Sequence, residues 1–296
     1  MDSNNDPHMF GIAEQPSQPS WQASRPGTNE ATADIHPSNY SGGKKSLSGI
    51  SLRAFWLGTA LGISVSLTVL FLVLSVRLWR VTFFVASLCL FHFLEYYVTA
   101  RYNTRHASVG SFLLTSNGWA YNVAHGSAIT ECILSHFIFP EGYFRWTRAI
   151  GDLKLQLILG LLLVIVGQTV RSLAMAHAGT NFNHTVQVVR KEGHTMVTDG
   201  VYRILRHPSY FGFFWWSIGT QLVLENVLCF WAYALVLRTF FSNRIQSELR
   251  LLEQNLCLFG YSDAPASTDE ERFLTLFFHE EYSDYMRRTW VGIPGL

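Results

Sequence analysis

LQLILGLLLVIVGQTVRSLAMAH, at residues 155–177, is the stretch that decides the fold class. A bilayer crossing needs about 20 mostly apolar residues, and this stretch meets that length with one charged side chain, Arg171. The whole chain of 296 residues is 49% hydrophobic and 15% charged, whereas a soluble domain averages about 25% charged residues. The sequence therefore predicts an integral membrane protein.

Five further apolar stretches lie on either side of this one, at residues 54–76, 81–99, 118–139, 209–224 and 226–241. The last two are short, and together they could form one tight helical hairpin that turns around Glu225 and Asn226. We therefore predict an all-α integral membrane protein with about six transmembrane helices.

The first 50 residues differ in composition, with prolines scattered among Ser, Asn, Gln, Gly and Thr and few aliphatic residues. Such a segment cannot bury a core, so residues 1–50 are predicted to form a disordered tail. The N-terminus has no basic start followed by an apolar run, so no cleavable signal peptide is expected. Transmembrane helices 1–4 are assigned to 51–177, and 178–296 forms the second region.

The distribution of basic residues predicts the orientation. With six spans, fifteen Lys and Arg residues fall on the side of the N-terminus and five on the other: Arg77, Arg80, Arg145, Arg148 and Lys154. Cytoplasmic loops carry an excess of Lys and Arg, so both termini and the loop at 178–207 are expected in the cytosol. Arg171 and Arg238 lie within spans and need separate explanations.

Charge, cysteines and motifs exclude several classes of protein. The 22 Lys and Arg residues against 21 Asp and Glu leave no broad cationic face for nucleic acid. The four cysteines lie far apart, which excludes a disulfide framework and a CxxC zinc site, and no metal is expected. The sequence motifs of dinucleotide binding (GxGxxG), the phosphate-binding loop (GxxxxGKS/T), zinc proteases (HExxH) and serine hydrolases (GxSxG) are missing.

The most informative string is LRHPSYFG, at residues 205–212, directly before an aromatic span. Proline is favoured in the first turn of a helix, so Pro208 marks the predicted cytosolic start of that span. The N–H groups and partial positive charge of a helix start suit a carboxylate or phosphate. The alternative is that Arg206 and His207 merely mark a membrane boundary.

This string, together with GTNFNH at 179–184, GVY at 200–202 and EEY at 280–282, resembles the isoprenylcysteine carboxyl methyltransferase family. The resemblance implies S-adenosyl-L-methionine as methyl donor and, as acceptor, the C-terminal carboxylate of a farnesylated or geranylgeranylated cysteine in a protein processed at a CaaX motif. It also implies the endoplasmic reticulum membrane, with the lipid bilayer and prenylated protein C-termini as partners and no nucleic acid.

The resemblance further implies a cytosolic cofactor pocket formed by the loop before the fifth span and the C-terminal helices. Arg244 matches the family's carboxylate-binding arginine, and Arg171 its arginine in the fourth span. The cofactor contacts carry over to Gln187, His194, Thr195, Met196, Val197, Tyr202, His207, Pro208, Ser209, Tyr210 and Glu270. Several of these residues also have a non-catalytic alternative. His194 could be a solvated loop residue, Tyr202 and Tyr210 could be aromatic residues at the membrane interface, and Arg244 could be a cytosolic positive charge that sets the topology.

One segment departs from the family pattern. After Arg244 the family continues almost at once into an acidic helix, whereas here an insert at 246–269 intervenes. Glu248 lies four residues after Arg244 and would share its helix face. Glu270 keeps the family spacing of ten residues to Glu280, and because flexible insertions cost little loop-closure entropy, Glu270 is the preferred acidic contact.

Other functions remain open at this stage. A membrane phospholipid N-methyltransferase would share the cofactor and the RHPxYxG string but accept an amine headgroup. An NADPH-dependent sterol reductase is disfavoured by the short chain, and a non-enzymatic scaffold by the polar loops on one side. Methyl transfer to a farnesylcysteine analogue would distinguish an isoprenylcysteine carboxyl methyltransferase from these alternatives.

The predicted orientation can be tested at the sequon Asn39-Tyr40-Ser41. N-glycans are attached to secreted and lumenal segments, so a cytosolic tail must leave Asn39 bare. In cells, treatment with an endoglycosidase should leave the electrophoretic mobility of the protein unchanged. A glycan on Asn39 would overturn the orientation.

Overall fold

The computed structural model of the chain describes residues 36–138, 155–184, 195–246, 281–282 and 284–296. The chain divides into two units, Met1–His36 and Pro37–Leu296, and the second contains every helix described below. The predicted tail at 1–50 therefore lies mostly outside the described residues.

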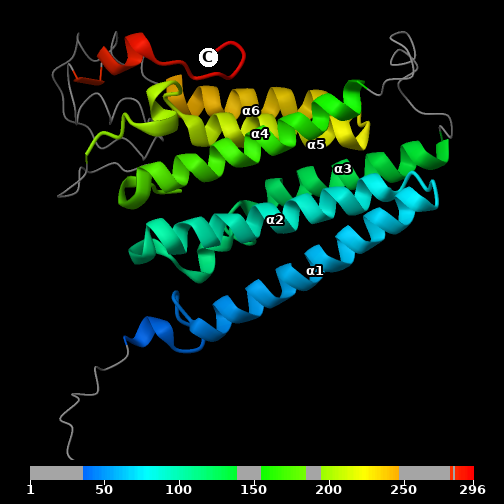
Figure 1. Ribbon diagram of the computed structural model, residues 1–296, viewed down its shortest axis with the longest axis horizontal. Coiled ribbons are helices and arrows are strands. Elements are labelled where there is room, and N and C mark those ends of the chain that lie inside the picture. The colour runs from blue at the N-terminus through cyan, green and yellow to red at the C-terminus, as the bar shows by residue number, and fades with distance from the viewer. Residues whose placement is uncertain (1–35, 139–154, 185–194, 247–280, 283) are drawn as a thin grey trace, which may run out of the picture. The chain divides into compact units, whose positions relative to one another are not determined.

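Among the described residues of the second unit, the long α-helices are α1 (Leu47–Val73), α2 (Trp79–Tyr102), α3 (Gly118–Ile138), α4 (Leu155–Ala178), α5 (Pro208–Leu224) and α6 (Leu228–Gln246), as Figure 1 shows. Each occupies one of the predicted apolar stretches, and the described residues form no β-strand, only one isolated bridge between Leu205 and Trp290. The all-helical prediction is confirmed for this part of the chain. Within the residues that the structure describes, three helices are long and apolar enough to cross a membrane: α1, α2, and α4 extended to Asn181.

The helix boundaries follow local capping. α1 begins at Leu47, before the predicted boundary at 50, because the Ser46 hydroxyl accepts the Gly49 N–H at 3.1 Å and caps the first turn. α5 and α6 form the predicted hairpin, and Glu225 takes a left-handed conformation at the turn with φ +59°. Glu131 of α3 accepts three backbone N–H groups at the start of α6, at 2.7–2.8 Å.

An ion cluster ties two helix connections together at one end of the bundle. The Glu225 carboxylate in the α5–α6 turn pairs with Arg77 at 3.3 Å and with Arg80. Arg80 also donates from Nε to the Val223 carbonyl at 3.0 Å. Figure 1 shows the α1–α2 connection and the α5–α6 turn at the same end. Two of the five basic residues expected on the far side of the membrane thus have a structural role.

Glycines allow α4 and α5 to pack closely against each other. A Cβ atom placed on Gly167 would lie 2.6 Å from the Gly212 carbonyl oxygen, and one placed on Gly212 would lie 2.6 Å from the Gly167 oxygen. One step along the same interface, a Cβ on Gly219 would lie 2.7 Å from the Gly160 oxygen. Small residues allow membrane helices to approach this closely, and here they fix α4 against α5.

A valine at position 167 should separate α4 from α5, because the added atoms meet backbone that cannot rotate away. Overpacking of this kind costs about 1–3 kcal/mol, so Gly167→Val should lower the melting temperature in detergent. The matched control is Gly62→Val in α1, where an added Cβ meets nothing within 4 Å. Equal melting temperatures for the two variants would contradict the assignment of this interface.

Candidate active site

One cavity of about 730 Å³ contains the sequence-predicted site. Its volume is in the range of small-molecule sites. Ten predicted residues that the structure describes line its wall: Arg171, Thr195, Met196, Val197, Tyr202, His207, Pro208, Ser209, Tyr210 and Arg244. The other predicted contacts, Gln187, His194 and Glu270, and the alternative Glu248, lie outside the described residues.

The start of α5 forms one wall of the cavity. Pro208 is the first residue of the helix, as predicted, and its fixed φ angle suits that position. The rings of His207 and Tyr210 are stacked with centroids 5.4 Å apart, and Tyr210 stacks in turn on Phe241 of α6 at 4.9 Å. This stack holds two predicted cofactor contacts in one rigid unit.

The loop at 195–197 is held against the end of α4. Asn181 accepts the Thr195 backbone N–H at 3.2 Å and donates to its hydroxyl at 3.4 Å. The Tyr202 hydroxyl donates to the Ala174 carbonyl at 3.3 Å. Asn181 also lines the cavity, and the sequence analysis did not name it as a site residue, although it lies in the GTNFNH string.

The C-terminal residues complete the wall. Residues 284–288 are helical, and Tyr282 and Tyr285 are buried against the cavity. The Tyr285 hydroxyl donates to the Tyr202 carbonyl at 2.7 Å. Trp290 then exchanges backbone hydrogen bonds with Arg206 and Ile204, at 2.7 and 3.0 Å. The described C-terminal residues and the segment before α5 thus contribute to one cavity wall.

Arg238, which the sequence left unexplained within a span, also holds this region. Its guanidinium donates from Nε to the Pro294 carbonyl at 3.2 Å and from Nη2 to the Gly295 carbonyl at 3.3 Å. The Trp215 indole donates to the Gly292 carbonyl at 3.0 Å. Both side chains therefore fasten the C-terminal segment to the α5–α6 hairpin.

Arg244 enters the cavity from the last turn of α6. Its Nε donates to the Tyr210 hydroxyl at 2.7 Å, and its Nη2 donates to the His184 carbonyl at 3.0 Å. The guanidinium lies over the rings of Tyr210 and Phe240, 5.4 and 5.9 Å from their centroids. The protein therefore fixes the orientation of the Arg244 guanidinium. A residue that only anchors the helix in the lipid head-group region would not need a fixed orientation.

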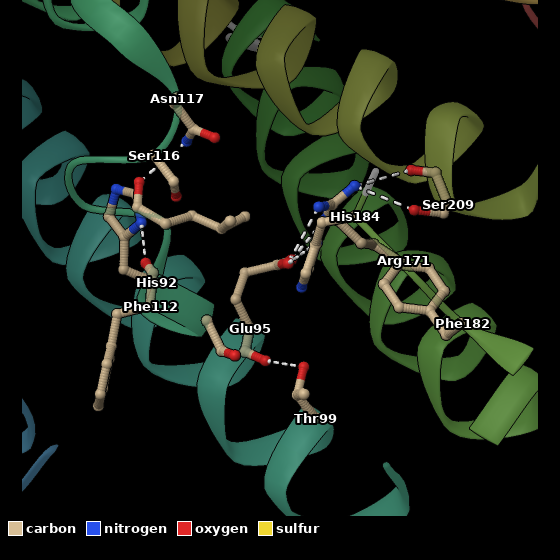
Figure 2. Close-up of polar contacts among 12 residues, drawn as sticks. His92, Glu95, Thr99, Phe112, Ser116, Asn117, Arg171, Phe182, His184 and Ser209 are labelled. Atoms are coloured by element: carbon tan, nitrogen blue, oxygen red, sulfur yellow. Dashed lines mark hydrogen bonds and ion pairs between the residues drawn. The ribbon is translucent and has the colours of Figure 1, made fainter. Parts of the chain in front are cut away.

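Arg171 is 8% exposed and pairs with a residue that the sequence analysis missed. Figure 2 shows Glu95 of α2 facing its guanidinium, with Ser209 of α5 on the far side. Arg171 Nε and Nη2 both donate to the Glu95 carboxylate, the second at 3.0 Å. Glu95 is the one acidic residue in the predicted span 81–99, and an ionisable residue within a span is a site candidate by default, which is the signal that was overlooked.

His184 is the second side chain beside Glu95. Its Nδ1 lies 3.7 Å from the carboxylate, while its Nε2 is shielded from solvent and has no hydrogen-bond partner among the described residues. Burial lowers the pKa of His184, and the nearby Arg171 and Arg244 act in the same direction against Glu95. A buried ring nitrogen on the cavity wall is the kind of group that a polar ligand satisfies.

The other part of the cavity wall is apolar and reaches the outer surface of the bundle. Trp119 and Val123 of α3 and Val236 and Phe240 of α6 line the cavity, although each is at least half exposed. Deeper wall residues on the same helices include His125 and Cys229. A single space therefore joins the polar groups around Arg244 to an apolar arm between α3 and α6.

The chain is similar to two proteins named protein-S-isoprenylcysteine O-methyltransferase. It is 41% identical to the protein of Saccharomyces cerevisiae, over 83% of this chain and 90% of the relative. It is 39% identical to the protein of Rattus norvegicus, over 83% of this chain and 74% of the relative. The chain belongs to the isoprenylcysteine carboxyl methyltransferase family. The family model, described as isoprenylcysteine carboxyl methyltransferase (ICMT) family, matches residues 158–254.

A solved structure of this methyltransferase family supports the assignment. It is titled as the eukaryotic intramembrane Ras methyltransferase ICMT, and it superposes with a TM-score of 0.68 at 32% identity, over 83% of this chain and 76% of that chain. The protein is therefore a membrane protein of the isoprenylcysteine methyltransferase fold. The names of the relatives agree with the predicted isoprenylcysteine carboxyl methyltransferase activity. They give no support to the alternative of a phospholipid N-methyltransferase.

The environment of His184 predicts how stability depends on pH. Its pKa is lowered from 6.5 in the folded protein, so the unfolded chain binds a proton more readily. The stability contributed by the neutral ring is complete above the unfolded pKa and declines as the pH falls below about 6.5. Replacement by glutamine, His184→Gln, should therefore reduce the fall in melting temperature between about pH 7 and pH 5. An unchanged pH dependence would show that the pKa of this ring is not lowered in the folded protein.

Proposed function

We propose that the protein transfers a methyl group from S-adenosyl-L-methionine to the C-terminal carboxylate of a farnesylated or geranylgeranylated cysteine. The observation that carries this proposal is the joined cavity, in which a fixed arginine fork lies at one end and an apolar arm between α3 and α6 at the other. A prenylated carboxylate has the same two parts, a charged end and a long apolar chain.

The proposed setting is the endoplasmic reticulum membrane, crossed about six times, with both termini and the loop at 178–207 in the cytosol. The tail precedes α1, which begins at Leu47, the first four spans follow, and 178–296 forms the catalytic region, whose insert is at 246–269. The positive-inside distribution and the placement of α1 to α6 support this division.

The cavity fits the methyl donor. Polar groups of Thr195 and His184, the His207–Tyr210 stack and the apolar side chains of Met196 and Val197 face one space at the start of α5. These residues would hold the donor, together with Gln187, His194 and Glu270. When bound, S-adenosyl-L-methionine supplies the methyl group: a carboxylate oxygen bonds to the methyl carbon while the carbon–sulfur bond breaks and its electron pair remains on sulfur.

The protein's task is positioning. The acceptor carboxylate is already ionised at neutral pH, so no side chain has to remove a proton. Arg244 would orient the carboxylate through paired hydrogen bonds, because the Tyr210 hydroxyl and the His184 carbonyl fix the plane of its guanidinium. Holding the reacting atoms in line provides the rate enhancement, and the surrounding side chains exclude water.

The apolar arm would hold the isoprenoid chain. Along α6 the cavity wall runs from Cys229 to Arg244, which at 1.5 Å per residue is about 22 Å. The exposed positions of Trp119 and Val236 on its rim would allow the chain to enter directly from the bilayer. The water-soluble donor would instead reach the polar end from the cytosolic side.

The function is tested by methyl transfer on membranes that contain the full chain. N-acetyl farnesylcysteine should accept labelled methyl groups from S-adenosyl-L-methionine, and the same membranes should not methylate phosphatidylethanolamine. The methyl ester formed on N-acetyl farnesylcysteine should be hydrolysed by base, whereas a methylated amine would be stable to base. Transfer to the phospholipid alone would replace the proposal with a phospholipid N-methyltransferase.

Replacing Arg244 should impair the acceptor more than the donor. A hydrogen bond to a charged group is worth about 1.5–3 kcal/mol, so Arg244→Ala should lower kcat/KM for the farnesylcysteine acceptor by roughly one to two orders of magnitude. Arg244→Lys should recover little, because a point charge does not replace a planar fork. Full activity of Arg244→Ala would make the residue a topological anchor instead.

A further inference from the structure

Glu95 is a carboxylate in the interior of α2 that is 1% exposed and is not part of the cavity wall. Burying such a charge is costly unless it is paired and hydrogen-bonded. Glu95 meets this condition through two parallel donors from Arg171, and His184 Nδ1 lies 3.7 Å from the same carboxylate. A carboxylate that lies behind the wall can act on the cavity through these two partners.

The first partner leads to the start of α5. With Nε and Nη2 held by Glu95, Arg171 directs Nη1 to the Ser209 hydroxyl at 3.0 Å and to the Ser209 carbonyl at 3.3 Å. The rings of Phe91 and Phe213 lie 5.2 and 5.4 Å from the guanidinium and confine it. The rotation of Arg171, and with it the contact to Ser209, is therefore set by Glu95.

The second partner leads to the end of α6. The imidazole of His184 faces Glu95, and its backbone carbonyl accepts the Arg244 Nη2 donor at 3.0 Å. In Figure 2 Arg171 and His184 converge on the same carboxylate. Glu95 thus connects both halves of the proposed site, the start of α5 and the guanidinium of Arg244.

The Glu95–Arg171 pair also affects the charge that Arg171 contributes to the cavity wall. Arg171 lines the cavity beside Ser209, and its positive charge is balanced by the carboxylate in direct contact. Without that carboxylate a desolvated cation would face the space proposed for a donor that is itself a cation. Like charges in a protein interior repel more strongly than in water, since the effective dielectric constant is lower.

We propose that Glu95 is a positioning residue for methyl transfer: it holds Arg171 against Ser209, helps to hold His184 beside Arg244, and balances the positive charge of Arg171 toward a cationic methyl donor. The inference rests on the proposed function and names a residue that acts through others. A purely structural ion pair would support the fold alone and would not distinguish a charged ligand from a neutral one.

The decisive measurement compares binding of S-adenosylmethionine, a sulfonium cation, with binding of S-adenosylhomocysteine, its neutral thioether. Glu95→Gln keeps the size of the side chain but removes the charge. In the purified full chain it should weaken binding of the cation relative to the thioether on the order of tenfold. It should also lower kcat/KM for N-acetyl farnesylcysteine about tenfold to a hundredfold, since a charge-assisted bond is lost. Glu95→Asp, which restores the charge, should recover the binding preference.

The matched control is Glu225→Gln. It removes the carboxylate of the other arginine cluster, whose members do not line the cavity. This variant should lower the melting temperature while leaving the preference between the two ligands unchanged. Equal losses of activity with an unchanged preference in both variants would reduce Glu95 to a structural role and overturn the proposal.

A second variant covers the case in which Glu95→Gln fails to fold. The double variant Glu95→Gln with Arg171→Gln removes both charges and should restore folding and the wild-type ligand preference. Its turnover should stay low, because the hydrogen bonds from Arg171 to Ser209 are missing. Wild-type turnover in the double variant would refute the positioning role. Inactivity of the wild-type chain toward farnesylcysteine would instead reject the proposed function, so the two failures are distinguishable.

Discussion

The close approach of α4 and α5 at Gly167 and Gly212 is the constraint on which the rest of the structure depends. Arg171 follows Gly167 by four residues, and Ser209 precedes Gly212 by three, so each lies on the same helix face as its glycine. The contact that brings the two backbones together therefore also brings the guanidinium against the start of α5. Packing and site geometry share one interface, and a change that widens it alters both.

Ion pairs organise the two ends of the helices in a similar way. Glu225 gathers Arg77 and Arg80 where α1, α2, α5 and α6 meet, and Glu95 gathers Arg171 and His184 near the cavity. A charge in an apolar interior is tolerated only with a partner, so each cluster specifies which helices lie together. The first cluster stands apart from the cavity, whereas two members of the second line it. The same physical device thus serves the fold at one end and the site at the other.

Much of this arrangement follows from local sequence signals. Length and apolar character located the six helices, and Pro208 marked the first residue of α5. The earlier start of α1 was missed because the Ser46 cap is a single hydrogen bond that composition does not reveal. Glu95 could have been named as the ionisable residue within its span, but its pairing with Arg171 could not be derived from the sequence. The contacts of Asn181 with Thr195 and of Arg238 with Pro294 could not be derived either, because they form only when the chain folds. The family motifs found the polar end of the cavity, but nothing in their spacing indicates the apolar arm, which α3 and α6 form only on packing.

The exposed rim of the apolar arm between α3 and α6 has a consequence for the acceptor concentration on which turnover depends. A substrate that enters past Trp119 and Val236 is drawn from the lipid phase, so its relevant concentration is its mole fraction in the bilayer and not its amount per volume of solution. Adding inert lipid dilutes such an acceptor within the membrane plane, while the soluble donor keeps its bulk concentration. Turnover would then obey surface-dilution kinetics for one substrate and ordinary saturation for the other, and the abundance of surrounding lipid becomes a variable that controls the flux.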